Sequence, residues 1–340
     1  MKYYGPLQGV DSHPWDAYGC RDMPEVLLAL TSPDGSDEAM PRLYDYVMNE
    51  DVVYPATIPA VSYIARLASS GVHTLELLYL LGRIAGAEHG VGVAPTEARS
   101  AVTRQLQILI TLLNHNAPDV RKLAVWAVAQ CQSPIDTIPA LEVLWRHESA
   151  PMVRADLLLA FAFLDPEKGL RVATQAINSS EVESVQLSAI LALVKSGAPW
   201  TNDLCVKVIS MLPTSGRFEE SAWTDDPLFD ITASLSARGE IAEACHLVTV
   251  GLESEAAQDE EARLQLIEAG QGLVLDYPSA RVMLLQAFLL NAESPGVDRI
   301  IRRELNHWIN FREVKVSLKS LTASHDANLA LRARQALGEA

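Results

Sequence analysis

Three neighbouring residues near the start of the chain carry the groups used in nucleophilic and acid–base chemistry: Asp11, Ser12 and His13. A working base must lie within hydrogen-bond reach of its nucleophile, and side chains adjacent in sequence rarely converge on one reacting atom. We therefore expect residues 1–21 to form an irregular cap over the first helical hairpin, with Trp15 as its apolar anchor. No catalytic residue is predicted.

Neither the histidines nor the cysteines follow a metal-ligand spacing. The eight histidines include no H-E-x-x-H pair, so no metal site is predicted. The four cysteines lie far apart in the sequence, and we expect them to be reduced, buried, small apolar side chains. The Gly90-Val91-Gly92 segment is too short for a dinucleotide-binding fingerprint, so no cofactor is expected.

One hypothesis for the function of this chain is an enzyme, as the alternative to a noncatalytic binding scaffold. A base-removing enzyme holds a flipped nucleobase between aromatic and acidic side chains. Residues of these types occur at Trp126, Trp145, Asp156 and Trp200. The formal net charge is −16, whereas nucleic-acid binding needs a basic surface, so a nucleic-acid partner is disfavoured. A DNA glycosylase with a pocket between repeats, or a tailoring enzyme of secondary metabolism, is the weaker hypothesis.

Trp145, Arg146, His147 and Glu148 form the first candidate binding patch, at the end of a predicted helix. One interpretation is an aromatic and charged recognition surface on the concave face of a helical repeat. The other is structural, with Trp145 in the core and the two cations at a helix C-terminus, where the helix dipole favours positive charge.

The second candidate binding region is strongly acidic. Residues 219–268 contain thirteen acids and two bases, a net charge of −11, whereas residues 299–334 carry +5. Such a block either keeps a long protein soluble or docks a cationic partner. The candidate docking residues are Glu219, Glu220, Trp223, Asp225 and Asp226.

Residues 118–148 show the element that must position these side chains. Val120, Leu123, Ala124, Ala127 and Val128 recur at the spacing of one buried helix face. Ser133 and Pro134 interrupt this pattern, and a second apolar face then begins at Ile138. The segment predicts two short helices that bury their apolar faces against each other and against neighbouring hairpins.

The hairpin pattern repeats along the chain. The pairs Val120-Arg121, Val153-Arg154 and Val185-Gln186 are separated by 33 and then 32 residues, a spacing typical of helical-pair repeats. Residues 57–61, TIPAV, match residues 137–141, TIPAL. The repeats predict an all-α solenoid with essentially no sheet, built as one domain over residues 1–340.

The predicted solenoid has three irregular features. One helix is expected over residues 96–113 after a glycine-rich segment. A long loop between repeats is expected over residues 213–227, where turn residues and acids replace the helical period. Residues 295–340 are expected to form C-terminal capping helices.

Composition limits the cellular setting. Hydrophobic residues make up 49% of the chain and charged residues 21%, which is typical of a folded protein. No apolar run is long enough for a membrane span, and the first residues lack the pattern of a secretion signal. We expect a cytoplasmic protein without a membrane partner.

The N-terminal part resembles bacterial HEAT-repeat proteins of a group common in actinobacteria. The matching residues are Trp15, Ala17, Tyr18, Gly19, Asp22, Met23, Pro24, Leu27, Leu30, Tyr54, Ala56 and Thr57. The resemblance covers roughly residues 10–200 in pattern, with Asn49-Glu50 where that group has a His-Gln pair. It implies an α-solenoid with a binding role, and some such proteins are suspected toxin-neutralising or maturation partners.

The main functional hypothesis is a noncatalytic scaffold that binds a protein or peptide through its concave face. An acidic chain favours a basic partner, such as a toxin held by an immunity-type protein or a peptide held by a chaperone. We expect a monomer or a weak oligomer.

Overall fold

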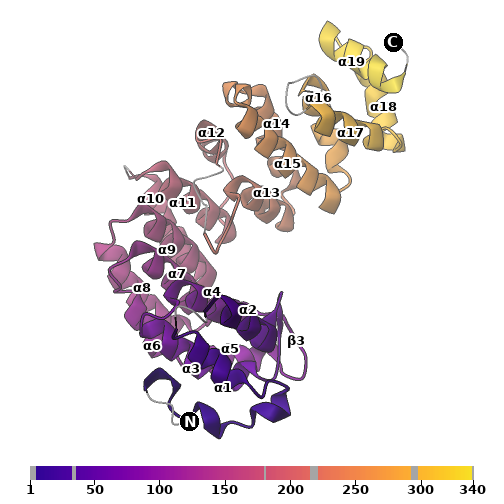
Figure 1. The fold of residues 1–340 in the computed structure, drawn as a ribbon. Coiled ribbons are helices and arrows are strands. Elements are labelled where there is room, and N and C mark those ends of the chain that lie inside the picture. The colour runs from indigo at the N-terminus through magenta and orange to yellow at the C-terminus, as the bar shows by residue number, and fades with distance from the viewer. Residues whose placement is uncertain (1–4, 33–35, 180, 215–220, 292–297, 339–340) are drawn as a thin grey trace. The chain divides into compact units, whose positions relative to one another are not determined.

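The computed structural model describes residues 5–32, 36–179, 181–214, 221–291 and 298–338 (Figure 1). The chain divides into two compact units, Met1–Val172 and Ala173–Ala340. Both units consist mainly of helices arranged in antiparallel pairs, which confirms the predicted all-α solenoid class. That the whole chain is one domain stays a prediction.

Unit 1 begins with three short 3₁₀ helices and continues with α-helices and three very short strands. Its elements are η1 (Gly5–Leu7), η2 (Val10–Ser12), η3 (Trp15–Tyr18), α1 (Met23–Ala29), α2 (Ser36–Val47), β1 (Met48–Asn49), β2 (Val52–Val53), α3 (Thr57–Ser69), α4 (Thr74–Gly86), β3 (His89–Gly90), α5 (Pro95–Thr103), α6 (Leu106–Leu112), α7 (Pro118–Gln130), α8 (Pro134–His147), α9 (Pro151–Leu164) and α10 (Pro166–Ile177), which continues past Val172.

Unit 2 continues the helical pairs. Its elements are α11 (Glu183–Lys195), α12 (Asn202–Ser210), α13 (Pro227–Ala237), α14 (Ile241–Glu253), η4 (Glu255–Gln258), α15 (Glu260–Asp276), α16 (Ala280–Asn291), α17 (Asp298–Trp308), α18 (Arg312–Leu321) and α19 (Ala327–Leu337).

The core of unit 1 lies between two layers of helices. The helices α4, α7 and α9 pack side by side in one layer, and α3, α6 and α8 pack against them from the other (Figure 1). Helix α9 is buried almost all round, from Val153 to Ala162, because it has neighbours on several sides. In unit 2, α13 packs in the same way between α11 and α15.

In each repeated Val-Arg or Val-Gln pair, the second residue donates hydrogen bonds to carbonyl oxygens of the segment that precedes its helix. Arg121 donates to the carbonyl oxygens of His115 and Asn116, at 2.8 and 2.9 Å. Arg154 donates to the carbonyl oxygens of Trp145 and Glu148, and Gln186 to that of Glu181. The recurring Val-Arg or Val-Gln pair therefore combines a buried apolar contact with satisfaction of loop carbonyls.

The single helix predicted over residues 96–113 is wrong, because the structure has two helices, α5 and α6, with a break at Arg104 and Gln105. The Thr103 hydroxyl contacts the carbonyl oxygen of Arg99 within α5 and that of Cys131 after α7, at 2.9 and 3.3 Å. Hydroxyl groups that bond back to the preceding turn bend helices.

A three-stranded sheet of two-residue strands is the only sheet in the described residues, and the sequence did not predict it. Strand β2 pairs antiparallel with β1 and parallel with β3. The sheet fastens residues 48–53 to the glycine-rich segment after α4. At Gly90 a Cβ would lie 2.1 Å from the carbonyl oxygen of Val93, so only glycine fits there.

Trp15 anchors the N-terminal segment, as predicted. Its side chain is 4% exposed, and its indole Nε1 donates to the carbonyl oxygen of Val10 at 2.6 Å. The indole also lies 6.4 Å from the ring of Tyr63 on α3, centre to centre.

The helices of the described residues include none with the length and apolar composition needed to cross a bilayer.

Candidate functional site

Trp145, in the first predicted patch, is half-buried against the next hairpin. The guanidinium of Arg154 lies 3.9 Å from the centre of its indole, and the Phe161 ring meets the indole edge-on at 6.3 Å. Both partners belong to α9. Trp145 therefore has a clear packing role, whereas the neighbouring Arg146 and His147 are exposed at the end of α8.

Glu148, the last residue of this patch, is a buried joint between hairpins. Its two carboxylate oxygens accept hydrogen bonds from Nε and Nη2 of Arg121 at 2.7 and 2.8 Å. The Oε1 oxygen also accepts from the backbone amides of Ser149 and Ala150. Burial raises the pKa of Glu148, but these hydrogen bonds and the charge of Arg121 outweigh burial, so the pKa lies below its usual range. The patch thus presents Arg146 and His147 to solvent, with Trp145 and Glu148 behind them.

The second predicted region leads into α13. Glu219 and Glu220 lie outside the described residues, Trp223 is half-buried, and Asp225 is exposed. Asp226 caps α13, because its Oδ1 accepts from the backbone amides of Leu228 and Phe229 at 2.9 and 3.3 Å.

Helices α13 and α15 together form an acidic surface. Burial, together with the nearby charge of Asp230, raises the pKa of Asp226, although its hydrogen bonds oppose this. Burial and the nearby charge of Asp226 raise the pKa of Glu268 on α15. The carboxylates of the two helices therefore lie close enough to repel one another.

An exposed aromatic ring lies among these acids. Phe229 of α13 is 41% exposed and lies directly over Gly272 of α15, where a Cβ would be 2.5 Å from the ring. We call Asp225, Asp226, Phe229, Asp230 and Glu268 the α13–α15 acidic face. Composition alone predicts the acidic block. It does not predict the position of Phe229, because the contact of this ring with Gly272 depends on how α13 packs against α15.

Two residues of the enzyme alternative are buried within unit 1. Trp126 on α7 and Asp156 on α9 come from neighbouring helices, but they are 6% and 1% exposed. Trp145 lies on α8, and Trp200 belongs to unit 2. A nucleobase would have no access to Trp126 or Asp156 without movement of α7 or α9.

The side chains of Ser12 and His13 in the Asp11-Ser12-His13 segment make structural contacts. The Ser12 hydroxyl donates to the carbonyl oxygen of Gly9 at 2.5 Å. The His13 ring packs against Trp15 and Tyr63, with centroids at 5.3 and 5.7 Å. Among the described residues, no three His, Cys, Asp or Glu side chains are grouped as a metal site would require.

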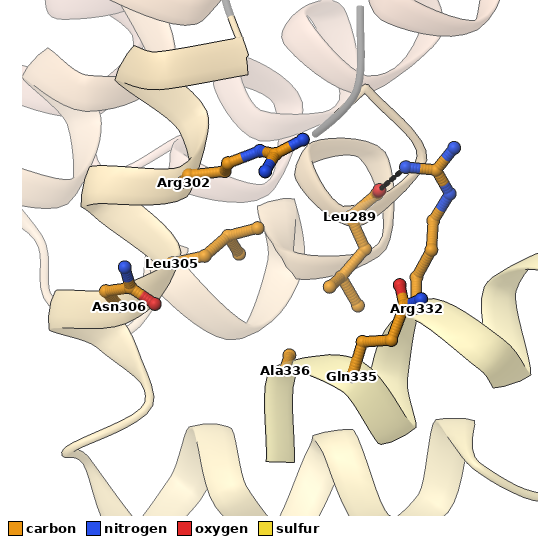
Figure 2. Close-up of a pocket in the computed structure, with 7 residues that line it drawn as sticks. All are labelled: Leu289, Arg302, Leu305, Asn306, Arg332, Gln335 and Ala336. Carbon is orange, nitrogen blue, oxygen red and sulfur yellow. Dashed lines mark hydrogen bonds between the residues drawn. The ribbon is translucent and has the colours of Figure 1, made fainter. Parts of the chain in front are cut away.

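A basic cleft of about 420 Å³ lies in the C-terminal segment of unit 2 (Figure 2). It is lined by Leu289, Arg302, Leu305, Asn306, Arg332, Gln335 and Ala336. Figure 2 shows the Arg302 and Arg332 side chains on either side of Leu289, whose carbonyl oxygen accepts from Arg332 Nη1 at 3.3 Å. The cleft accounts for part of the positive charge of residues 299–334.

An aromatic surface that the sequence did not predict lies on α4. The Tyr79 ring stacks on Trp126 at 5.4 Å with an interplanar angle of 18°. The Arg83 guanidinium lies 5.7 Å from the Tyr79 ring and donates to Asp51 at 2.8 Å. The four-residue spacing of Tyr79 and Arg83 on one helix was the available signal.

Comparison with known proteins identifies one family resemblance. Residues 106–194, which span α6 to most of α11, match the family model described as HEAT repeats. This segment includes the helical hairpin of residues 118–148. No curated protein matches the chain at a significant level.

Proposed function

We propose that this chain is a noncatalytic scaffold that binds a basic protein or peptide. The HEAT-repeat match over residues 106–194 supports a scaffold, because stacked helical pairs of this kind commonly present extended binding surfaces. The proposal concerns binding alone and assigns no reaction to the chain.

The α13–α15 acidic face carries the proposal. Burial raises the pKa of both Asp226 and Glu268, and the neighbouring charges of Asp230 and Asp226 add to this effect. A cationic partner would relieve the repulsion between these charges when it binds. Phe229 supplies an exposed aromatic contact between the charges, and an aromatic group flanked by charges is a common arrangement at binding hot spots.

The charge of the whole chain supports the same partner. A net charge of −16 attracts a basic molecule over distances up to the Debye length, about 8 Å at physiological salt. Such attraction raises the association rate more than it lowers the dissociation rate. In this proposal the partner is a basic toxin covered by an immunity-type protein, or a basic peptide held by a chaperone.

A reducing compartment suits the cysteines. Cys20, Cys131, Cys205 and Cys245 are all buried free thiols. Disulfides are rare in the cytosol, where thiols stay reduced, so we propose a cytoplasmic location.

The experiment measures association of a synthetic peptide of alternating lysine and glycine with the full chain. The test variant is Asp225→Lys with Glu268→Lys. Asp226 is left unchanged because its substitution would remove the α13 cap. The matched control is Glu253→Lys with Glu261→Lys, two exposed acids outside the acidic face.

We expect the test variant to slow association several-fold at low salt, and the control to slow it less. The difference should shrink as salt is added. Equal effects of the two variants would show that only net charge matters. No binding by the unmodified chain would overturn the proposal.

A further inference from the structure

A cavity of about 360 Å³ in unit 1 lies where the N-terminal segment meets α3 and the break between α5 and α6. We call it the α3–α5 pocket. Its volume falls within the range of small-ligand sites, roughly 300 to 1,000 Å³. Its polar lining comes from three separate segments of the chain and consists of His13, Tyr18, Ser62, Arg104 and Gln105.

The rest of the lining is apolar. Ile58 and Pro59 come from the first turn of α3, and Ala101, which is 2% exposed, comes from α5. A ligand could therefore bury an apolar part against these three side chains while it contacts the polar groups.

The polar lining keeps most of its hydrogen-bonding capacity unused. Within the described residues, four of its five side chains have no hydrogen-bond or ion-pair partner: His13, Tyr18, Arg104 and Gln105. The fifth, Ser62, donates to the carbonyl oxygen of Pro59 at 3.4 Å, which is long for a hydroxyl donor.

Two of these groups are held in place by aromatic packing. The rings of His13 and Tyr18 are half-buried and lie 5.3 and 6.2 Å from the Trp15 ring, centre to centre. Side chains that packing already holds lose little freedom when a ligand binds, so they are preorganised for recognition.

Arg104 is the one permanently charged residue of the lining. The arginines on α3, α4, α5 and α7 all donate hydrogen bonds to other groups of the chain. By contrast, the residues three and four positions away from Arg104 include no acid that could form a helical ion pair with it. Its guanidinium is therefore available to an external anion.

The charges around the pocket also favour an anion. Nε of Arg66 donates to the carbonyl oxygen of Ser62 at 2.9 Å, which places a second guanidinium beside the lining. Burial raises the pKa of Tyr63, which contacts His13. Of the two neighbouring charges, Arg66, which lowers this pKa, acts more strongly than Asp11, which raises it.

We propose that the α3–α5 pocket binds a carboxylate that carries an apolar group. The carboxylate pairs with the guanidinium of Arg104, and the neutral donors of the lining fix its orientation. The apolar group packs on Ile58, Pro59 and Ala101. This inference does not rest on the proposed function, because the ligand here is an anion.

Two kinds of molecule present this chemistry: a free carboxylic acid and the C-terminus of a peptide. The test measures binding of both to the full chain by isothermal titration calorimetry. The probes are isocaproate and N-acetyl-glycyl-glycyl-leucine. The matched control for each is its amide, which keeps the shape and loses the charge. Inorganic phosphate tests an anion without an apolar group.

Arg104→Gln removes the charge from the pocket. Its matched control is Arg171→Gln, which removes an exposed arginine from α10. Tyr18→Phe removes one hydroxyl and keeps the ring against Trp15, and Tyr54→Phe is its control at a half-buried tyrosine outside the pocket. All four variants should melt like the unmodified chain, because none removes a buried contact.

We expect each acid to bind at least fivefold more tightly than its amide. Arg104→Gln should weaken binding of the acids about fivefold and Tyr18→Phe about twofold, with both controls unchanged. Tighter binding of isocaproate would identify a free acid as the ligand, and tighter binding of the peptide would identify a C-terminus; either result supports the proposal.

Four results would overturn it. They are the absence of binding by either acid, equal binding of acids and amides, phosphate binding as tight as that of the acids, and equal losses for Arg104→Gln and Arg171→Gln.

Discussion

The indole ring of Trp126 lies directly on the backbone of Gly82: a Cβ on that glycine would fall 2.1 Å from the Cζ3 atom of the ring. The two residues come from α7 and α4, which pack side by side in unit 1. The absence of a side chain at Gly82 is therefore what allows these two helices to approach with a tryptophan between them.

Gly82→Ala should destabilise the protein. In an exposed helix interior this change stabilises by about 1 kcal/mol, because alanine favours the helix. Here the added methyl group overlaps the indole, and overpacking costs roughly 1 to 3 kcal/mol. Chemical denaturation measures the difference.

Gly86→Ala on the same helix is the matched control. Its new methyl group would meet the carboxamide end of Gln130 at 3.0 Å, and that flexible side chain can rotate away. Stability should stay the same or rise. A loss as large as that of Gly82→Ala would show that α4 tolerates no alanine for another reason.

Trp126→Ala should lower the free energy of unfolding by roughly 3 to 5 kcal/mol, because it removes a buried aromatic side chain and leaves a cavity. Trp145→Ala should cost less, since Trp145 is only half-buried. Thermal melting of the two variants side by side gives the order. A smaller loss for Trp126→Ala would contradict its burial against Gly82.

The sequence predicts the helix that carries Trp126 but not the residues that this side chain contacts. The apolar spacing of residues 118–130 predicts the helix and its buried face. The partner of Trp126 could not be read, because Gly82 and Tyr79 meet it only once the register between α4 and α7 is set. Local spacing carries no information on that register.

Contacts between segments far apart in the sequence also explain the other differences between the sequence-based predictions and the structure. The break at residues 104–105 depends on a hydroxyl that contacts a carbonyl oxygen after α7, and the small sheet depends on a segment far along the chain. The acidic block was visible from composition, but its pairing of Asp226 with Glu268 required α13 and α15 to be neighbours.

Glu148→Gln should destabilise the protein at neutral pH by roughly 3 kcal/mol, because Arg121 loses its buried partner. The folded-state pKa of Glu148 lies below its unfolded value, so the charged carboxylate adds stability above the unfolded pKa. This stability is lost as the pH falls through the folded pKa. The difference between the two proteins should therefore shrink in acid.

Unfolding by urea at neutral pH and at a pH of about 3 tests this linkage. Glu142→Gln serves as the control, because Glu142 pairs with Arg146 and Lys168 at a more exposed position. Its effect should be within about 1 kcal/mol. If Glu148→Gln lowered the free energy of unfolding equally at both pH values, the loss would come from the shape of the side chain and not from its charge.

Glu268→Gln should stabilise the fold at neutral pH. Burial and the charge of Asp226 raise the folded-state pKa of Glu268, so the charged form opposes folding above that pKa. The penalty declines as the pH falls and is absent below the unfolded pKa. Melting temperatures should thus differ at neutral pH and converge in acid, whereas Glu261→Gln, in the first turn of the same helix, should not raise the melting temperature at neutral pH.

Cys131 should resist alkylation in the folded protein. Burial raises its pKa to about 12, although Thr103 and Arg99 oppose this, and the thiolate is the reactive form. Iodoacetamide followed by mass spectrometry should label Cys131 only after denaturant is added. Rapid labelling of the native chain would show that the end of α7 opens readily.

The Glu148 joint has a consequence for how the surface between hairpins moves. The amides of Ser149 and Ala150 lie in a loop, where hydrogen exchange is ordinarily fast, yet both are bonded to a carboxylate that Arg121 also holds. These amides exchange only when they leave the Glu148 carboxylate, which Arg121 of α7 holds in place. Their exchange should therefore be slower than that of other loop amides, and residues 148–150 should resist proteases that cut other exposed loops.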